Sequence, residues 1–316
     1  MALALAWIVL SAPGPALGGS SAAGTKGFSG INLGGSARLL AMGGAGTAGV
    51  REPAAIWVNP ARLAGMQAPE MSFTHGVWLV DTTLEQFAGA YPTPLGILGG
   101  AFSIVRAGEI DEFDKNGVET GSFTPADSEF SGAYAVSLGS FAFGAVASYL
   151  RSELADDATA AAFAGGFGAG FAPHPALTVS AAVLHVGSSL KYDRKASSLP
   201  ATLRGGVSYS LRSAGVSLAA DAVKPGDGEI EFRGGAEEEF RVLDELSASV
   251  RCGWHSLAPG PGGGTTGISA GGGITWRPGR GLGDSERDIS AVRVDYAWTP
   301  MGDLGAAHWF SFALIF

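Results

Sequence analysis

The sequence has few charged residues and a single cysteine. Charged side chains make up 16% of its 316 residues, well below the roughly 25% of a typical soluble domain. Cys252 has no second cysteine to pair with, so no disulfide framework holds the fold and cysteine usage does not indicate the redox compartment. The net charge of −9 argues against nucleic-acid binding, because phosphates attract basic surfaces.

The sequence also lacks a long apolar run. After the N-terminus, no stretch of about 18 or more residues is uncharged and apolar, which excludes membrane-spanning helices. Hydrophobic residues nevertheless make up 46% of the chain, and 50 residues are glycine. Such a chain is either a large glycine-rich sandwich or a barrel whose strands alternate lipid-facing and interior-facing residues.

The last residues of the chain alternate between apolar and small or polar side chains. The apolar positions are Phe310, Phe312, Leu314 and Phe316. This alternation predicts a strand with one face in an apolar environment. It fits an edge strand of a soluble sandwich, or the strand that closes an outer-membrane β-barrel by pairing with the first strand. A closed barrel has no free edges.

Fourteen alternating segments follow one another from about residue 70, each near the length that a tilted strand needs to cross a bilayer. They span residues 70–79, 84–92, 97–108, 128–138, 140–154, 161–173, 177–190, 200–211, 214–225, 230–240, 246–256, 267–278, 289–300 and 308–316. Several carry charges at every second position, which a wet or plugged lumen tolerates better than a sandwich core. The candidate lumen charges are Arg204, Arg233, Glu237, Glu239, Arg293 and Asp295. The sequence therefore predicts an all-β protein, a transmembrane antiparallel β-barrel of about 14 strands in the bacterial outer membrane.

The connections between these segments alternate in length. The third, seventh and eleventh span about residues 109–127, 191–199 and 257–266, whereas the fourth is little more than Gly139. Outer-membrane barrels have short periplasmic turns and longer extracellular loops. The odd-numbered connections are therefore expected to be extracellular, although residues 279–288 are longer than this rule predicts for a periplasmic turn.

The chain before the first strand divides into two parts. Residues 1–18 predict a signal peptide, with an apolar core at residues 3–10 and a small-residue cleavage site at residues 16–18. No Lys or Arg precedes that core, so a short buried helix is the alternative. Residues 19–69 do not alternate, and their prolines and apolar residues favour a compact plug, or hatch, inside the barrel formed by residues 70–316.

Two tracts resemble the PorV/PorQ family, within the wider FadL-like group of fourteen-stranded outer-membrane barrels. The first comprises Ala37-Arg38, residues 41–45, Glu52, residues 54–55, residues 57–61 and residues 63–64; the second comprises residues 295–305 followed by His308 and the terminal strand. The sequence departs from the family where Glu52-Pro53 replaces paired acids and where Arg62 replaces a frequent Gly. The resemblance implies a plug motif inside the barrel, with a structural or gating role. Its residues are Met42, Gly43, Gly44, Trp57, Asn59, Pro60 and Ala61.

Three short motifs suggest chemistry but lack the context it needs. Residues 44–49 match a dinucleotide-binding fingerprint, yet no strand precedes them. Residues 267–271 have nucleophile-elbow spacing, yet no helix follows. Residues 112–117 resemble the start of a calcium loop, yet Phe123 stands where a bidentate Glu is required. The five histidines and Cys252 show no metal-ligand spacing. We therefore expect no enzyme activity, no cofactor and no metal.

Two functions remain open from the sequence. By resemblance, the barrel is a non-catalytic component of protein secretion or cell-surface attachment that binds exported proteins or a translocon. The alternative is a FadL-like transporter that releases hydrophobic small molecules, such as long-chain fatty acids, sideways into the bilayer. A water-filled porin ranks third, because an occupied lumen would block diffusion.

The charged lumen positions favour the secretion role, because unpaired charges beside an apolar ligand are costly. The expected partners are outer-membrane lipid and lipopolysaccharide, together with either secreted cargo or a translocon, or a hydrophobic ligand. No nucleic acid is expected.

Overall fold

A computed structural model describes most of the chain. The described residues are 35–78, 81–155, 158–192, 195–226, 228–256, 267–278, 289–301 and 305–316. The predicted signal peptide, residues 19–34 of the predicted plug domain, and the connections at residues 257–266 and 279–288 lie outside them.

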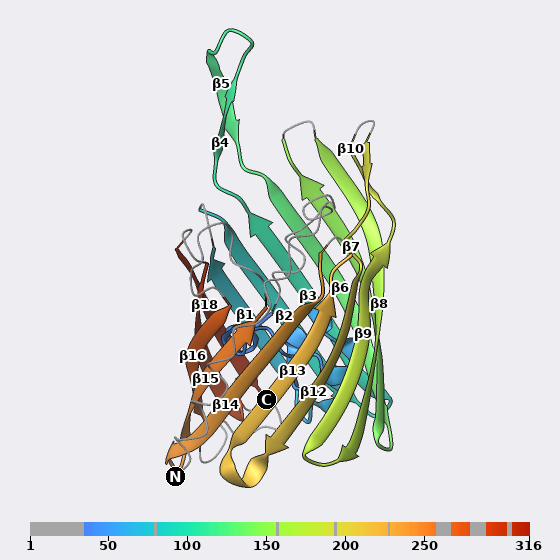
Figure 1. Ribbon diagram of the computed structural model, residues 1–316, viewed down its shortest axis with the longest axis vertical. Helices are drawn as coiled ribbons and strands as arrows, with labels where there is room; N and C mark the ends of the chain where they lie inside the picture. Colours follow the sequence, from blue (N-terminus) through green and yellow to red (C-terminus); the bar gives the residue numbers. More distant parts are fainter. Residues whose placement is uncertain are drawn as a thin grey trace.

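Fourteen antiparallel strands form a closed barrel (Figure 1). They are β1 (Glu70–Val77), β2 (Thr83–Thr93), β3 (Gly96–Arg106), β6 (Ala126–Leu138), β7 (Phe141–Glu153), β8 (Thr159–His174), β9 (Leu177–Gly187), β12 (Thr202–Leu211), β13 (Val216–Lys224), β14 (Glu231–Leu243), β15 (Leu246–His255), β16 (Ile268–Trp276), β17 (Ala291–Pro300) and β18 (Ala306–Ile315). Each expected segment coincides with one of these strands to within three residues at either end. The predicted all-β barrel is therefore confirmed.

The last strand closes the barrel as its alternation predicted. Strand β18 pairs with β1 from Glu70 opposite Ile315 to Val77 opposite His308. Phe310 and Phe312 point outward, with 50% and 43% of their surface exposed, whereas Leu314 and Phe316 are half-buried at the end of the wall. The outward aromatic face and the closed sheet are what a lipid-facing wall requires.

The outward face of the strands is largely apolar. Large hydrophobic side chains stand exposed on the outward face of nearly every strand, among them Phe87, Phe130, Phe163, Leu218 and Val250. An apolar surface of this extent is unfavourable in water and is solvated by acyl chains in a bilayer. Because the lipid-facing positions alternate with small or polar inward positions, each strand can serve both surfaces at once.

The two ends of the barrel differ. One end carries long connections, two of which contain hairpins: β4 (Ile110–Phe113) with β5 (Glu119–Phe123), and β10 (Leu190–Tyr192) with β11 (Lys195–Ser197). The β4–β5 hairpin projects well beyond the wall (Figure 1). The opposite end has tight turns such as the one at Gly139, whose φ of +60° suits glycine. The sequence predicted these connection lengths but not the hairpins, which are too short for alternation to reveal.

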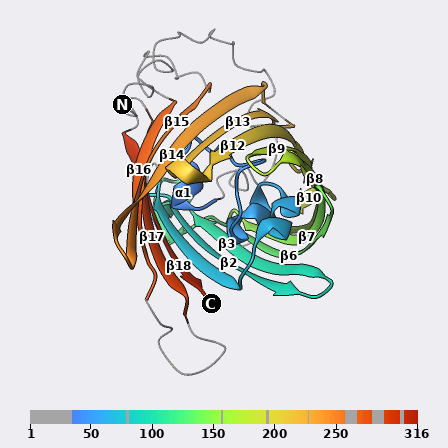
Figure 2. The same cartoon turned by 90° about the horizontal axis from the view of Figure 1, so that it is seen from below.

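Residues 35–66, which we call the inner segment, lie inside the ring of strands (Figure 2). The inner segment contains α1 (Ala37–Ala41) and the 3-10 helices η3 (Pro53–Trp57) and η4 (Pro60–Gly65). Helix α1 contacts β15 to β18, η3 contacts β1 to β3, and η4 contacts β3 and β6 to β8. None of the helices among the described residues has the length and apolarity needed to cross a membrane.

Local sequence signals explain how the inner segment folds. The Ser36 hydroxyl caps α1 by accepting a hydrogen bond from the Leu39 amide, and proline occupies the first position of both η3 and η4. These are the residue types that favour helix starts. The turns between the short helices therefore follow from residues 36, 53 and 60.

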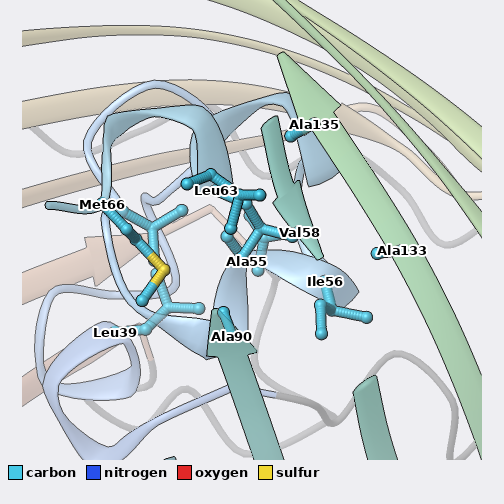
Figure 3. Packing of buried hydrophobic residues seen from close by; sticks show 11 residues of the cluster. Leu39, Ala55, Ile56, Val58, Leu63, Met66, Ala90, Ala133 and Ala135 are labelled. Carbon is cyan, nitrogen blue, oxygen red and sulfur yellow. The ribbon is translucent and has the colours of Figure 1, made fainter. Parts of the chain in front are cut away.

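Apolar residues of the inner segment pack against one side of the wall, and we call this the central cluster. It comprises Leu39, Val50, Ala55, Ile56, Val58, Leu63 and Met66 of the inner segment with Ala90, Ile97, Ala133 and Ala135 of β2, β3 and β6 (Figure 3). The wall contributes mostly alanine, which leaves space for the larger side chains of the inner segment. The core of this barrel is thus formed between the inner segment and the wall.

Candidate functional site

Six charged side chains form a closed ring of alternating sign where the inner segment meets the wall. We call this the ion ring, and its members in order are Arg38, Glu237, Arg251, Asp295, Arg293 and Glu52. Two members belong to the inner segment, and the other four face inward from β14, β15 and β17. The ring therefore joins the inner segment to the wall through charge pairs.

The charged groups of the ion ring lie within hydrogen-bonding distance of one another along the wall. Arg38 donates to both carboxylate oxygens of Glu237 at 2.7 Å each. Arg251 joins Glu237 at 2.5 Å to Asp295 at 2.7 Å. A bidentate guanidinium–carboxylate pair combines two strong hydrogen bonds with a fixed orientation, so α1 is held at one angle to β14.

Arg293 completes the ion ring. It lies 3.0 Å from Asp295 and 2.9 Å from Glu52, and it also contacts Glu70 of β1 at 2.8 Å. Arg38 and Glu52 approach to 3.7 Å. Taking charges out of water costs several kcal/mol for each ion unless partners satisfy them. The closed arrangement supplies a partner of opposite sign on both sides of every member.

A second polar contact, which we call the clasp, holds the turn at residues 44–47 of the inner segment. One carboxylate oxygen of Asp221 accepts hydrogen bonds from the Gly46 amide at 2.9 Å, the Thr47 amide at 2.9 Å and the Thr47 hydroxyl at 2.7 Å. Arg204 donates to the Gly44 carbonyl at 3.1 Å and to the Thr47 hydroxyl at 3.2 Å. The clasp thus attaches this turn to β12 and β13.

Asn59 organises the middle of the inner segment. Its side-chain oxygen accepts from the Ala61 amide at 3.1 Å, and its side-chain nitrogen donates to the Thr47 carbonyl at 2.8 Å. It is fully buried against β8, where a Cβ on Gly168 would lie only 1.9 Å from the Asn59 oxygen. Gly144 allows a similarly close approach of Ala61 to β7. Asn59 therefore needs both its own hydrogen bonds and glycine in the wall.

The residues of the plug motif all lie in the interior. Met42, Trp57, Asn59 and Ala61 are buried, as are Gly43, Gly44 and Pro60. This describes their position, and a gating role for them stays a prediction.

The six candidate lumen charges divide into four groups. Glu237, Arg293 and Asp295 belong to the ion ring, and Arg204 belongs to the clasp. Arg233 pairs with Glu231 at 2.6 Å. Glu239 lies beside the β12–β13 turn with its side chain 44% exposed and pairs with Arg277 at 3.3 Å, so it belongs to the rim.

Sequence reasoning missed five members of these contacts. Glu70, Asp221 and Arg251 were not singled out, and Arg38 and Glu52 were considered only for their resemblance. Arg251 stands at an inward position between outward Val250 and Cys252, a signal that alternation could have supplied. Nothing local marks Arg38 as the partner of Glu237.

A second apolar cluster lies nearer the end with long connections, and we call it the hairpin cluster. It comprises Leu150, Ala160, Ala162, Ala164, Leu190 and Leu199. Figure 2 shows β10, which carries Leu190, beside β8 within the ring of strands. Along β7, Val146 at the central cluster and Leu150 at the hairpin cluster are four positions apart, or about 13 Å. Ser148 lies between them and bonds to Ser131 at 2.8 Å.

The acidic turn at residues 112–117 forms the tip of the β4–β5 hairpin. The Asp114 carboxylate accepts from the Asn116 amide at 2.8 Å and the Val118 amide at 2.9 Å. These backbone donors, Val118 first, hold the pKa of Asp114 below its usual value. The carboxylate therefore stabilises the turn. Among the described residues, no group of three or more His, Cys, Asp or Glu side chains could hold a metal ion.

No family model and no curated protein matches the chain. Solved structures do resemble it: the toluene transporter TodX of P. putida (11% identity, TM-score 0.60, 90% of this chain and 99% of that one); a Pseudomonas aeruginosa FadL homologue (11%, 0.60, 90% and 98%); and the toluene transporter TbuX of Ralstonia pickettii (15%, 0.53, 89% and 97%). At these identities the likeness shows the fold alone.

The structural neighbours are FadL-like outer-membrane barrels, and membership of the PorV/PorQ family is not supported by them. Together with the apolar exterior, the shared fold confirms the prediction of a bacterial outer-membrane barrel.

Proposed function

We propose that this chain carries hydrophobic small molecules across the bacterial outer membrane. The observation that carries the proposal is that the ion ring and the apolar clusters lie on different arcs of the wall, with Glu129 of β6 as a buried acid on the apolar arc that accepts a hydrogen bond from Ser131. The ion ring draws its wall residues from β14, β15 and β17, whereas the central and hairpin clusters draw theirs from β2, β3 and β6 to β8. These are opposite arcs of the wall.

The pairing of the six candidate lumen charges answers the main sequence-based objection to an apolar ligand. That objection assumed charges without partners beside the ligand, yet each member of the ion ring is paired. The apolar arc offers alanines and leucines from the long-connection end down to the inner segment. Ligand sites of this kind are mostly apolar with a few polar groups, and Ser131, Ser148 and Glu129 supply such groups here.

The structural neighbours support the same class of solute. Two are toluene transporters and one is a FadL homologue. The shared fold is compatible with the proposal. The paired charges and the apolar arc of this chain are the features that would accommodate an apolar solute.

Uptake by intact cells tests the proposal. Gram-negative cells without other hydrocarbon channels would express the chain, and radiolabelled toluene and a long-chain fatty acid would serve as probes. Leu190→Asp places a charge in the fully buried hairpin cluster, and we expect it to abolish uptake. Val118→Asp, on the exposed β4–β5 hairpin, is the matched control and should leave uptake unchanged. The proposal would be refuted if cells with the correctly inserted, unsubstituted barrel took up no more probe than cells without it.

A secretion or cell-surface attachment role, by resemblance to the PorV/PorQ family, is the second candidate. The observation that favours it is the β4–β5 hairpin, which projects from the barrel and exposes Ile110, Phe113 and Val118. Under this candidate, replacing residues 109–124 by a short turn abolishes display of exported protein at the cell surface and leaves solute uptake intact. If that variant kept both surface display and solute uptake, the hairpin would no longer support this candidate.

A further inference from the structure

A narrow crevice separates the inner segment from the β12–β13 hairpin. Its wall side presents Ser208, Ser210 and Ser217, and its inner side presents Gly46, Gly49 and Val50. The free space suffices for about one water molecule. In the described arrangement, therefore, this crevice is closed to any larger solute.

At Gly49, beside the crevice, the inner segment packs against the wall less tightly than it does at η4. A Cβ built on Gly49 would lie 3.4 Å from the Ser208 Cβ and 3.8 Å from the Ala219 Cβ, which is ordinary contact. On the opposite side, Cβ atoms on Gly144 and Gly168 would lie 2.4 Å and 1.9 Å from inner-segment atoms. The inner segment is thus wedged against β7 and β8, whereas against β12 and β13 it makes only ordinary contact at Gly49 and packs closely at Thr47, whose Cβ would lie 2.9 Å from a Cβ on Gly206.

The part of the inner segment that faces the crevice is built to bend. Residues 43, 44, 46 and 49 are glycine, and Gly43 and Gly44 have φ values of +68° and +75°. Residues 44–50 form no helix beyond short turns. Their polar attachment to the wall is the clasp made by Asp221 and Arg204. A few glycine-rich loop positions held by hydrogen bonds are a typical hinge.

The chemistry of the crevice fits an apolar solute with a polar group. Leu39, Met42 and Val50 provide its apolar side, and the paired Arg38 and Glu52 of the ion ring also line it. Serine hydroxyls line the wall, and those of Ser210 and Ser217 bond to each other at 3.0 Å. This pair lies next to the turn at residues 212–215, so the crevice extends toward the end with short connections.

We propose that solutes leave the barrel toward the periplasm through this crevice, when the turn at residues 44–50 releases the clasp and moves away from β12 and β13. The proposal rests on the proposed transport function and names its exit. It assigns the movement to one turn, while α1 stays bound through the ion ring and η4 stays wedged against β7 and β8.

A reversible disulfide tests this exit. Gly49→Cys with Ala219→Cys places two Cβ atoms at 3.8 Å, within the range of natural disulfides, and the periplasm oxidises such pairs. Cys252→Ser removes the native thiol. Gly170→Cys with Ala142→Cys has the same Cβ separation of 3.8 Å but joins only the wall strands β7 and β8, so it is the matched control.

Radiolabelled toluene uptake is measured in cells before and after a membrane-permeant reductant. We expect the Gly49–Ala219 staple to abolish uptake and the reductant to restore it, whereas the control staple has no effect in either state. Full uptake by quantitatively cross-linked Gly49–Ala219 protein would overturn the proposed exit and leave the transport function standing. No uptake by the unsubstituted protein would overturn both.

A second variant covers the case in which the staple prevents folding. Asp221→Asn weakens the clasp without changing side-chain size, and we expect faster toluene uptake together with measurable ion conductance in planar bilayers. Unchanged uptake and conductance in a folded Asp221→Asn barrel would overturn the assignment of the turn as the moving element.

Discussion

Arg38 and Glu237, which are 199 residues apart in the chain, are joined by two hydrogen bonds of 2.7 Å. This pair connects helix α1 of the inner segment to strand β14 of the wall, and the ion ring continues from it on both sides. The inner segment is therefore anchored by charge on one side, by close packing on the other, and by the clasp between them. Each anchor makes a different prediction.

Arg38→Met tests the charge anchor. Removing the guanidinium leaves Glu237 with Arg251 alone and Glu52 with Arg293 alone, and breaking a buried pair costs about 3–5 kcal/mol. We expect a loss of folding free energy of this size in urea unfolding of protein in lipid vesicles. Arg277→Met is the control, because its pair with Glu239 is half-exposed and such pairs contribute about 0–1 kcal/mol. Equal effects of both substitutions would contradict an anchoring role for the ring.

Gly168→Ala tests the packed side. The added Cβ would lie 1.9 Å from the Asn59 oxygen, so Asn59 must move and its bonds to Ala61 and Thr47 weaken. Overpacking of this kind costs about 1–3 kcal/mol, read as a lower temperature for loss of the folded band on semi-native gels. Gly132→Ala meets nothing within 4 Å and should behave like the unsubstituted protein. A folded Gly168→Ala barrel of unchanged stability would show that Asn59 is not wedged.

The barrel could be predicted from the sequence because alternation is a local property. It gave each strand to within three residues and placed Phe310 and Phe312 on the outer face. The short β4–β5 and β10–β11 hairpins escaped, since three to five residues do not define a period. The signal peptide, the domain boundaries and the role of the plug motif stay predictions.

The ion ring could not be predicted, because alternation shows which way a residue faces but not what it meets. Arg293 was recognised as inward, yet its pairing with Glu52 spans 241 residues. That pairing matters for function: charges treated as unpaired disfavoured an apolar ligand, and the same charges when paired do not. Whether these charges are compatible with an apolar ligand therefore depends on their long-range partners, which the local sequence pattern does not show.

Phe87→Lys tests the lipid-facing exterior. Phe87 lies mid-strand on β2, points outward and stands opposite Phe73 and Phe102 of the neighbouring strands. A lysine at the midplane of a barrel's lipid face costs about 2–4 kcal/mol. The same urea measurement in vesicles should show this loss, whereas Phe113→Lys on the projecting hairpin, where the side chain is 60% exposed, should change stability by less than about 0.5 kcal/mol. Equal tolerance of both lysines would place Phe87 in water.

Thr47→Val tests the clasp apart from the charge of Asp221. The Thr47 hydroxyl donates to Asp221 at 2.7 Å and accepts from Arg204 at 3.2 Å, and valine has the same shape without either bond. Because the hydroxyl is fully buried, its removal leaves a charged donor and a charged acceptor each short of one partner, at a cost of about 1–3 kcal/mol. We expect that loss to fall on the turn, so that amides of residues 44–50 exchange hydrogen faster while those of the ion-ring strands stay protected. Thr120→Val, on an exposed hairpin strand, provides the matched loss of a hydroxyl and should leave exchange in the turn unchanged. Uniformly faster exchange throughout the inner segment would instead mean that the inner segment opens as one unit, without an independent turn.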